Sequence, residues 1–279
     1  MRVLLAGCMG QLGRSIQETW QEHELVVPSE TEFDIVDWWA TKRIVEQVRP
    51  DVVVNAAAFT DVDGCESQRD LAFRINALGP RNLACACLAY GAALVQISTN
   101  CVFDGTASEP YLEFDRTNPI SVYGLSKLAG EEAVQHILPR HYIVRTAWLY
   151  SAHGRNFVKT VLRLAGERER LSMVADEVSS PTFAPDLARA LLALVREPAY
   201  GTYHFTNSGA CSRYEFAAEI LRLAGRKSVR LDPISLKDYV RPSRPPLYSP
   251  LRNYCGESIG IALRPWQDAL ASAISLLSP

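Results

Sequence analysis

The sequence predicts an α/β fold, a Rossmann-like doubly wound parallel sheet with a smaller C-terminal α/β substrate lobe, from two observations. Short apolar runs alternate with longer amphipathic stretches through the first half of the chain. After about residue 150 proline, glycine and serine interrupt that alternation more often. Strands that alternate with helices imply right-handed crossovers. We therefore expect a parallel-sheet domain over 1–150 and mainly a smaller lobe over 151–279, with some chain crossing back to the sheet.

The expected strands of the first half read as nearly continuous apolar runs, as strands buried on both faces do. They cover residues 2–6, 24–27, 51–55, 93–98 and 142–145. The stretches between them carry apolar residues at helical spacing, and Pro50 marks the break before the third strand. These helices cover residues 12–22, 38–48, 71–90 and 122–137, the third as one long helix.

Four more helices are expected after residue 150. Ser212 suits an N-cap because its hydroxyl can accept a first-turn N–H, and Pro265 suits a first helical position. The four helices cover residues 156–165, 185–195, 212–224 and 265–277.

Composition excludes several classes of protein. With 29 basic and 31 acidic residues, the chain is too balanced to attract nucleic acid or anionic lipid by charge alone. Its seven cysteines are scattered without a CxxC pair, and its five histidines form no HExxH motif, so we expect no disulfide framework and no metal. Because the sequence shows neither a signal peptide nor an 18-residue apolar window, we expect a cytoplasmic protein with no membrane partner.

Three glycines, Gly7, Gly10 and Gly13, follow the first strand and open the first helix. In that position glycines permit a tight turn and let backbone N–H groups approach a pyrophosphate, which predicts dinucleotide binding. Glu30 is nearly in place to hold an adenosine ribose, whereas Arg14 could instead meet a 2′-phosphate. The choice between NADH and NADPH therefore stays open.

Tyr123 and Lys127 lie four residues apart at the start of an expected helix, so their side chains share one face. A phenol has a pKa near 10 and is a poor acid at neutral pH, but a nearby ammonium favours the phenolate and lowers that pKa. Thr99 ends an expected strand at the ligand-binding edge of the sheet. These three residues predict a ketone reductase in which Tyr123 gives the proton.

Further segments that span nearly the whole chain carry a family resemblance. They are the glycine loop with Gln11-Leu12-Gly13, Pro50 to Ala58 with Thr60 and Val62-Asp63, Val102 to Gly105, Tyr123 to Lys127, Arg145 to Tyr150, Asn156-Phe157 and Arg264 to Gln267. Through these motifs the chain resembles the extended short-chain dehydrogenase/reductases, and within them the dTDP-4-dehydrorhamnose reductase family.

The resemblance implies that hydride from NADPH or NADH reduces a dTDP-4-keto-6-deoxyhexose, with Tyr123 as proton donor, Lys127 as its electrostatic support and Thr99 as carbonyl orienter. It implies a cofactor site made of Gly7, Gly10, Gln11, Leu12, Gly13, Ser29, Asp34, Ile35, Ala56, Ala57, Ala58, Thr60, Ser98, Tyr123 and Lys127. It implies a substrate site made of Val62, Asn100, Cys101, Trp148, Asn156, Arg244 and Ser249. A monomer and a homodimer both remain open.

The chain departs from the family pattern in three places. Asn100 and Cys101 stand where the family usually has aspartate and tyrosine, which puts the identity of the sugar in question. Ser15 stands where some members carry a magnesium-binding glutamate, so no such metal is expected. The arginine-rich loop around Arg241 and Arg244 could face a ligand phosphate or be solvated, and it is one residue longer than usual.

Three functions remain open from the sequence. The leading hypothesis is reduction of dTDP-4-dehydro-L-rhamnose to dTDP-L-rhamnose. An alternative is reduction of a related dTDP-4-keto-deoxysugar for a specialised glycoside, which Asn100 and Cys101 would explain. A third, from another class, is a non-catalytic regulatory subunit that resembles the regulatory chain of methionine adenosyltransferase.

Overall fold

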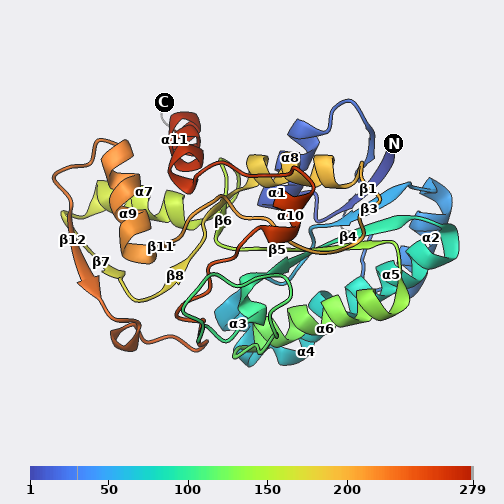
Figure 1. Ribbon diagram of the computed structural model, residues 1–279, viewed down its shortest axis with the longest axis horizontal. Coiled ribbons are helices and arrows are strands. Elements are labelled where there is room, and N and C mark those ends of the chain that lie inside the picture. The colour runs from blue at the N-terminus through green and yellow to red at the C-terminus, as the bar shows by residue number, and fades with distance from the viewer. Residues whose placement is uncertain (30, 278–279) are drawn as a thin grey trace.

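The computed structural model describes residues 1–29 and 31–277 and confirms the predicted α/β class (Figure 1). Within these residues, a six-stranded parallel sheet has the order β10-β5-β4-β3-β1-β2. Its strands are β1 (Arg2–Ala6), β2 (Glu24–Val26), β3 (Val52–Asn55), β4 (Ala93–Thr99), β5 (His141–Thr146) and β10 (Gly201–His204). The first five agree with the predicted strands to within one residue at each end. The prediction missed β10, which lies at an edge of the sheet.

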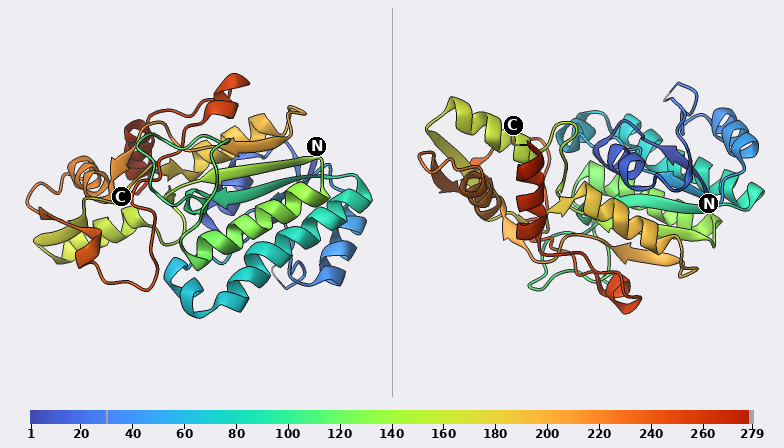
Figure 2. Two further views of the ribbon diagram at one scale, coloured as in Figure 1. Left: turned by 60° about the horizontal axis from the view of Figure 1, so that its bottom comes forward. Right: turned by 90° about the horizontal axis from the view of Figure 1, so that it is seen from above.

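Strand alternation sends neighbouring residues to two separate cores. Val3 and Leu5 pack in one core with Leu187, whereas Leu4 packs in the other with Leu83. The first core is covered by α1 (Gln11–Thr19) and α8 (Ala184–Leu194). The second is covered by α2 (Trp38–Val48), α5 (Gly79–Tyr90) and α6 (Val122–Ile137). The sheet is therefore buried on both faces, as its apolar strands require, and Figure 2 shows these helix layers.

Two of the predicted helices differ from the structure. The expected helix over 71–90 is divided into α4 (Arg69–Phe73), the π-helical segment η1 (Arg74–Leu78) and α5, and α3 (Val62–Ser67) precedes it. Pro80 has no N–H to donate to the Asn76 carbonyl, and the Gly79 N–H instead bonds the Arg74 carbonyl. The expected helix over 12–22 ends at Thr19, because the next residue, Trp20, turns into the core.

A smaller lobe lies beside the sheet, at the left of Figure 1. It contains α7 (Phe157–Glu167) and α9 (Arg213–Leu223), which pack on a parallel pair of strands, β7 (Arg170–Val174) and β12 (Arg230–Ile234), and α11 (Trp266–Leu277), which packs on α9. Ser212 caps α9 as predicted, and its capping box with Glu215 is complete. Pro265 precedes α11 instead of beginning it, because it pairs as a β-bridge with Ser208.

Short elements that the sequence did not reveal connect the two parts of the molecule. They are β6 (Leu149–Tyr150), β8 (Val178–Ser179), β9 (Thr182–Phe183), β11 (Cys211–Ser212), α10 (Tyr254–Ser258) and the 3-10 turns η2 (Asn100–Val102) and η3 (Leu236–Asp238). Since α8 and β10 pack with the large sheet, the chain crosses back to it after residue 150. The domain boundary at residue 150 stays a prediction.

Candidate active site

A cavity of about 670 Å³ lies where the carboxyl ends of the strands meet the smaller lobe. This is the edge at which open α/β sheets bind ligands. A second cavity of about 400 Å³ lies across Gly10 and Ala56 to Ala58. The described lining of the larger cavity includes most of the predicted site residues, namely Gly10, Gln11, Leu12, Ala56, Ala57, Ala58, Thr60, Val62, Ser98, Thr99, Asn100, Cys101, Tyr123, Lys127, Trp148, Asn156 and Ser249.

The glycine loop is fixed by close contact with its own backbone. Gly7 has a φ of +75°, and a Cβ there would lie 2.4 Å from the Ala57 nitrogen. A Cβ on Gly13 would lie 2.2 Å from the Gly7 carbonyl oxygen. Gly10 is the N-cap of α1, where no described side chain caps the first turn, and it lines both cavities. The first-turn N–H groups of α1 therefore suit the diphosphate of a dinucleotide.

The second cavity brings together Gly7, Ser29, Asp34 and Ile35 from the predicted cofactor set. The Ser29 hydroxyl donates to a Glu32 carboxylate oxygen at 2.7 Å. Gly13 is not among the described residues that line either cavity, since its role is the packing of α1 against the loop.

Glu30 and Arg14 were the two residues considered for contact with the adenosine ribose or its 2′-phosphate. Neither decides between NADH and NADPH. Arg14 is absent from the described linings of both cavities, and it donates to the Met9 carbonyl at 3.3 Å. Glu30 lies outside the described residues.

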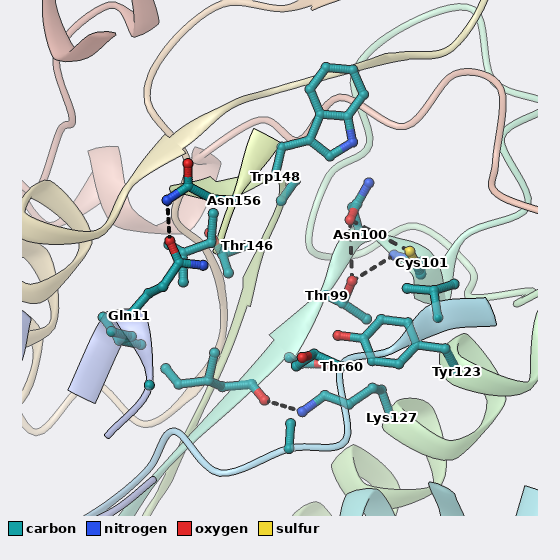
Figure 3. A pocket seen from close by; sticks show the side chains of 18 of the residues that line it. Gln11, Thr60, Thr99, Asn100, Cys101, Tyr123, Lys127, Thr146, Trp148 and Asn156 are labelled. Carbon is teal, nitrogen blue, oxygen red and sulfur yellow. Dashed lines mark hydrogen bonds between the residues drawn. The ribbon is translucent and has the colours of Figure 1, made fainter. Parts of the chain in front are cut away.

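Close packing of α6 on the end of β4 brings the predicted catalytic side chains together. A Cβ on Gly124 would lie 2.1 Å from the Cys101 carbonyl oxygen, so only glycine allows this approach. The Tyr123 hydroxyl and the Thr99 hydroxyl both point into the larger cavity at the end of β4. One turn further along α6, the Lys127 ammonium donates to the Ile97 carbonyl at 2.6 Å. Figure 3 shows these side chains facing the same space.

The electrostatics of this group correct one prediction from the sequence. Burial raises the pKa of Tyr123, although the neighbouring Thr99 side chain opposes that rise. Burial also lowers the pKa of Lys127 to about 8, against the attraction of Glu131. The expectation that Lys127 lowers the phenol pKa is wrong for this structure, because the Lys127 ammonium is directed to Ile97. Tyr123 is therefore neutral and holds the proton that a donor must supply.

A buried ion pair behind this group was missed from the sequence. The guanidinium of Arg145 and the carboxylate of Glu131 meet at 2.7 Å, with 6% and 1% of the side chains exposed. The Ser98 hydroxyl also donates to Glu131. The signal was present in the spacing, since Tyr123, Lys127 and Glu131 repeat every four residues on α6.

Asn100 joins the end of β4 to segments of the smaller lobe. Its side-chain amide donates to the Ser249 hydroxyl at 2.7 Å and to the Ser179 hydroxyl at 3.1 Å. Its carbonyl oxygen accepts from the Thr99 hydroxyl at 3.2 Å. Asn100 therefore orients a predicted catalytic group. Beside it, burial raises the pKa of the Cys101 thiol to about 11, which keeps that thiol neutral.

The far side of the larger cavity carries charges, of which only Arg241 was expected from the sequence as one that could face a ligand. The Arg213 guanidinium lies 3.5 Å from the centre of the Trp148 ring and 3.3 Å from a Glu177 oxygen. Arg241 reaches the cavity and donates to Asp63 at 3.0 Å. Arg244 is exposed and is not among the described lining residues of either cavity, because the loop turns its neighbour Arg241 inward instead.

Asn156, from the predicted substrate set, ties the lobe to the glycine loop. It is the N-cap of α7, where its side-chain oxygen accepts from the Lys159 N–H, and its amide donates to the Gln11 side-chain oxygen at 3.0 Å. Val62 begins α3 on the other side of the cavity. Of the described residues, no three histidine, cysteine, aspartate or glutamate side chains are grouped to hold a metal ion. None of the described helices has the length and apolarity to cross a membrane.

Comparison with known proteins agrees with this geometry. The model of the family described as RmlD substrate binding domain matches residues 1–278. The chain belongs to this family. The resemblance to the extended short-chain dehydrogenase/reductases and the dTDP-4-dehydrorhamnose reductases, drawn from the motifs, is thereby confirmed.

Solved structures resemble the chain over its whole length. A crystal structure of a dTDP-4-dehydrorhamnose reductase from Clostridium acetobutylicum is 46% identical, with 99% of each chain covered and a TM-score of 0.97. The dTDP-4-dehydrorhamnose reductase of Bacillus anthracis, solved in complex with NADP, is 39% identical, with 98% of each chain covered and a TM-score of 0.95. A curated relative, the dTDP-4-dehydrorhamnose reductase of Streptomyces griseus, is 40% identical over 99% of this chain and 94% of its own.

Proposed function

We propose that this protein reduces the C4 ketone of dTDP-4-dehydro-L-rhamnose to dTDP-L-rhamnose with NADPH or NADH. The single observation that carries the proposal is that Tyr123, Thr99 and Lys127 line the larger cavity together, with Lys127 one helical turn from Tyr123. The names of the relatives and the NADP in the Bacillus anthracis structure support the same substrate and cofactor.

The cofactor fits the two cavities. The first turn of α1 at Gly10 would hold its diphosphate, the loop with Ser29, Asp34 and Ile35 would hold its adenosine, and Ala56 to Ala58 would border its length. When bound, the reduced nicotinamide supplies the hydride that adds to the ketone carbon.

The residues of the chain manage the proton and the charge. As the ketone oxygen gains negative charge, the Tyr123 hydroxyl gives it a proton and becomes a phenolate. The Thr99 hydroxyl, which donates to the Asn100 side chain in this structure, would turn to donate a hydrogen bond to the same oxygen and fix its direction. The ammonium of Lys127, on the same face of α6, donates to the Ile97 carbonyl in this structure and would turn toward the phenolate once that charge forms, which stabilises it. The hydride on carbon and the proton on oxygen complete the alcohol.

The deciding experiment follows cofactor absorbance when the purified protein meets enzymatically generated dTDP-4-dehydro-L-rhamnose, with NADH and NADPH in separate reactions. We expect oxidation of at least one cofactor and dTDP-L-rhamnose as the product. Cofactor binding without oxidation would contradict the proposal and favour the regulatory subunit.

A related dTDP-4-keto-deoxysugar is the second candidate substrate, because Asn100 and Cys101 replace the aspartate and tyrosine usual in the family. Both residues line the larger cavity. Product analysis separates the two candidates: turnover of the related ketone with a much higher kcat/KM than dTDP-4-dehydro-L-rhamnose would favour this second substrate. A monomer or homodimer and a cytoplasmic location remain part of the proposal.

A further inference from the structure

Trp148 is held in a backbone conformation that a bulky residue rarely adopts. Its φ is +43°, in the left-handed region that favours glycine. Strain of this kind persists only where the surrounding structure enforces it, and it occurs at ligand sites. The residue after it, Leu149, pairs with Thr182 through β6 and β9, and the Thr182 N–H donates to the Trp148 carbonyl at 3.3 Å. The backbone is therefore fixed from the lobe side.

The ring of Trp148 is fixed by a second set of contacts. The Arg213 guanidinium lies 3.5 Å from its centre, a short distance for a cation over an aromatic face. Phe216, also on α9, stacks with it at a centroid separation of 6.3 Å. The ring is only partly buried, and it lines the larger cavity together with Arg213 and Glu177.

Glu177 in turn fixes Arg213. Its carboxylate accepts from two nitrogens of the guanidinium at 3.3 Å each, and its carbonyl accepts from the Arg213 N–H at 3.1 Å. The Glu177 and Arg213 side chains are 8% and 22% exposed. Because a buried guanidinium without its carboxylate is costly, the pair holds Arg213 in one position over the ring.

We infer that Arg213, held by Glu177, is a positioning residue that sets the Trp148 ring as a wall of the substrate side of the cavity. Trp148 comes from the end of β5 and Tyr123 from α6, and Figure 3 shows them on different sides of the space between them. A sugar whose ketone meets Tyr123 would place another part of its ring against Trp148. This inference rests on the proposed function, and it assigns the arginine an effect on sugar affinity and not on hydride transfer.

The test compares Arg213→Met and Arg213→Lys with a matched control, Arg222→Met, which removes an exposed arginine from the same helix. For Arg213→Met we expect the KM for the sugar nucleotide to rise about tenfold, with kcat, NADPH affinity and dTDP affinity close to wild type. Arg213→Lys should recover part of the loss, and Glu177→Gln, which keeps one acceptor, should raise KM about threefold. Arg222→Met should behave as wild type. An unchanged KM in Arg213→Met would overturn the inference.

Two further readouts separate positioning from direct contact and from misfolding. Since the arginine acts through the ring, Arg213→Met should cost much less in a Trp148→Ala background than in the wild type. Fully additive losses, or a loss of dTDP affinity as large as that of the sugar nucleotide, would contradict the inference and indicate a direct phosphate contact.

The chain has five tryptophans, so the fluorescence of a Trp148→Phe variant is subtracted to isolate the signal of Trp148. Acrylamide should quench this signal more strongly in Arg213→Met than in the wild type, because the ring becomes more accessible. This readout needs no turnover. If the wild type fails to reduce the sugar, the proposed function is contradicted, but the quenching experiment still tests the positioning of the ring. If quenching is unchanged in Arg213→Met, the positioning alone is contradicted.

Discussion

The two walls of the larger cavity are held in place by different interactions. The sheet wall, made of Thr99, Tyr123 and Lys127, is fixed by strand pairing and by the close approach of α6 to the end of β4. The lobe wall, made of Trp148, Glu177, Arg213 and Arg241, is fixed by charge pairs and stacking between segments far apart in the sequence. Under the proposed function, the rigid sheet wall performs the reaction, whereas the lobe wall selects what reaches it.

The largest effect should come from removing the proton donor of the sheet wall. Tyr123→Phe should lower kcat by about 10³-fold, in the range expected for loss of a general acid. NADPH affinity should change little, because the hydroxyl acts on the ketone. Steady-state kinetics and fluorescence titration measure the two quantities, and Tyr239→Phe, at an exposed tyrosine, is the matched control. A variant with wild-type kcat would remove Tyr123 from the mechanism.

Removal of the cation should have the next largest effect. Lys127→Met should lower kcat by about 10²-fold and weaken cofactor binding, because one ammonium serves the phenolate and the nicotinamide ribose. Stability should not fall with activity, since burial already disfavours the charge and lowers the Lys127 pKa to about 8. Thermal unfolding checks this point, with Lys227→Met as the exposed control. Unchanged cofactor affinity would argue against the ribose contact.

The pH dependence of activity should report the protonation state of the same lysine. Above pH about 8 Lys127 loses its proton, so kcat/KM should fall by up to about tenfold per pH unit. The unfolded chain, with its lysine pKa near 10.5, binds more protons between these two values, so this residue makes the free energy of unfolding rise with pH across that window. Lys127→Met should abolish this contribution. Activity and stability that decline together above pH 8 would show unfolding instead of titration.

The smallest effect on catalysis should come from Asn100, which connects the walls through Thr99, Ser179 and Ser249. Asn100→Asp replaces a donating amide by an acceptor, so both serine hydroxyls must reverse. We expect the free energy of unfolding to fall by about 1–3 kcal/mol in urea titration, with kcat changed less than in the Lys127 variant. Gln21→Glu, at an exposed amide, should leave stability unchanged. An equally stable Asn100→Asp protein would show that these hydrogen bonds contribute little.

The sheet wall was largely predictable from the sequence because its signals are local. Apolar runs predicted β1 and β3 to β5, and the four-residue spacing of Tyr123 and Lys127 placed both on α6. The Lys127 pKa was not predictable, because it depends on burial by segments distant in the chain. The region of Asn76 and Pro80 was expected as one regular helix for a different reason: the effect of the missing Pro80 N–H, which is local, was overlooked.

The lobe wall was hardly predictable. Trp148, Glu177 and Arg213 meet only because short strands such as β6 and β8, of two residues each, bring their segments together. Strands that short carry no periodicity. The edge strand β10 is as long as β3, but it was missed because its sequence, Gly-Thr-Tyr-His, is not an apolar run. The exposed position of Arg244, with Arg241 turned inward, depends on a loop whose course no local pattern gives.

The most direct test of this division is a single-turnover measurement of cofactor oxidation, with Tyr123→Phe and Arg213→Met compared at saturating dTDP-4-dehydro-L-rhamnose. Saturation removes differences in affinity, so only the chemical step is compared. We expect Tyr123→Phe to be slower than wild type by about 10³-fold and Arg213→Met to react at nearly the wild-type rate. Equal slowing of both variants, or rapid oxidation by Tyr123→Phe, would contradict this division.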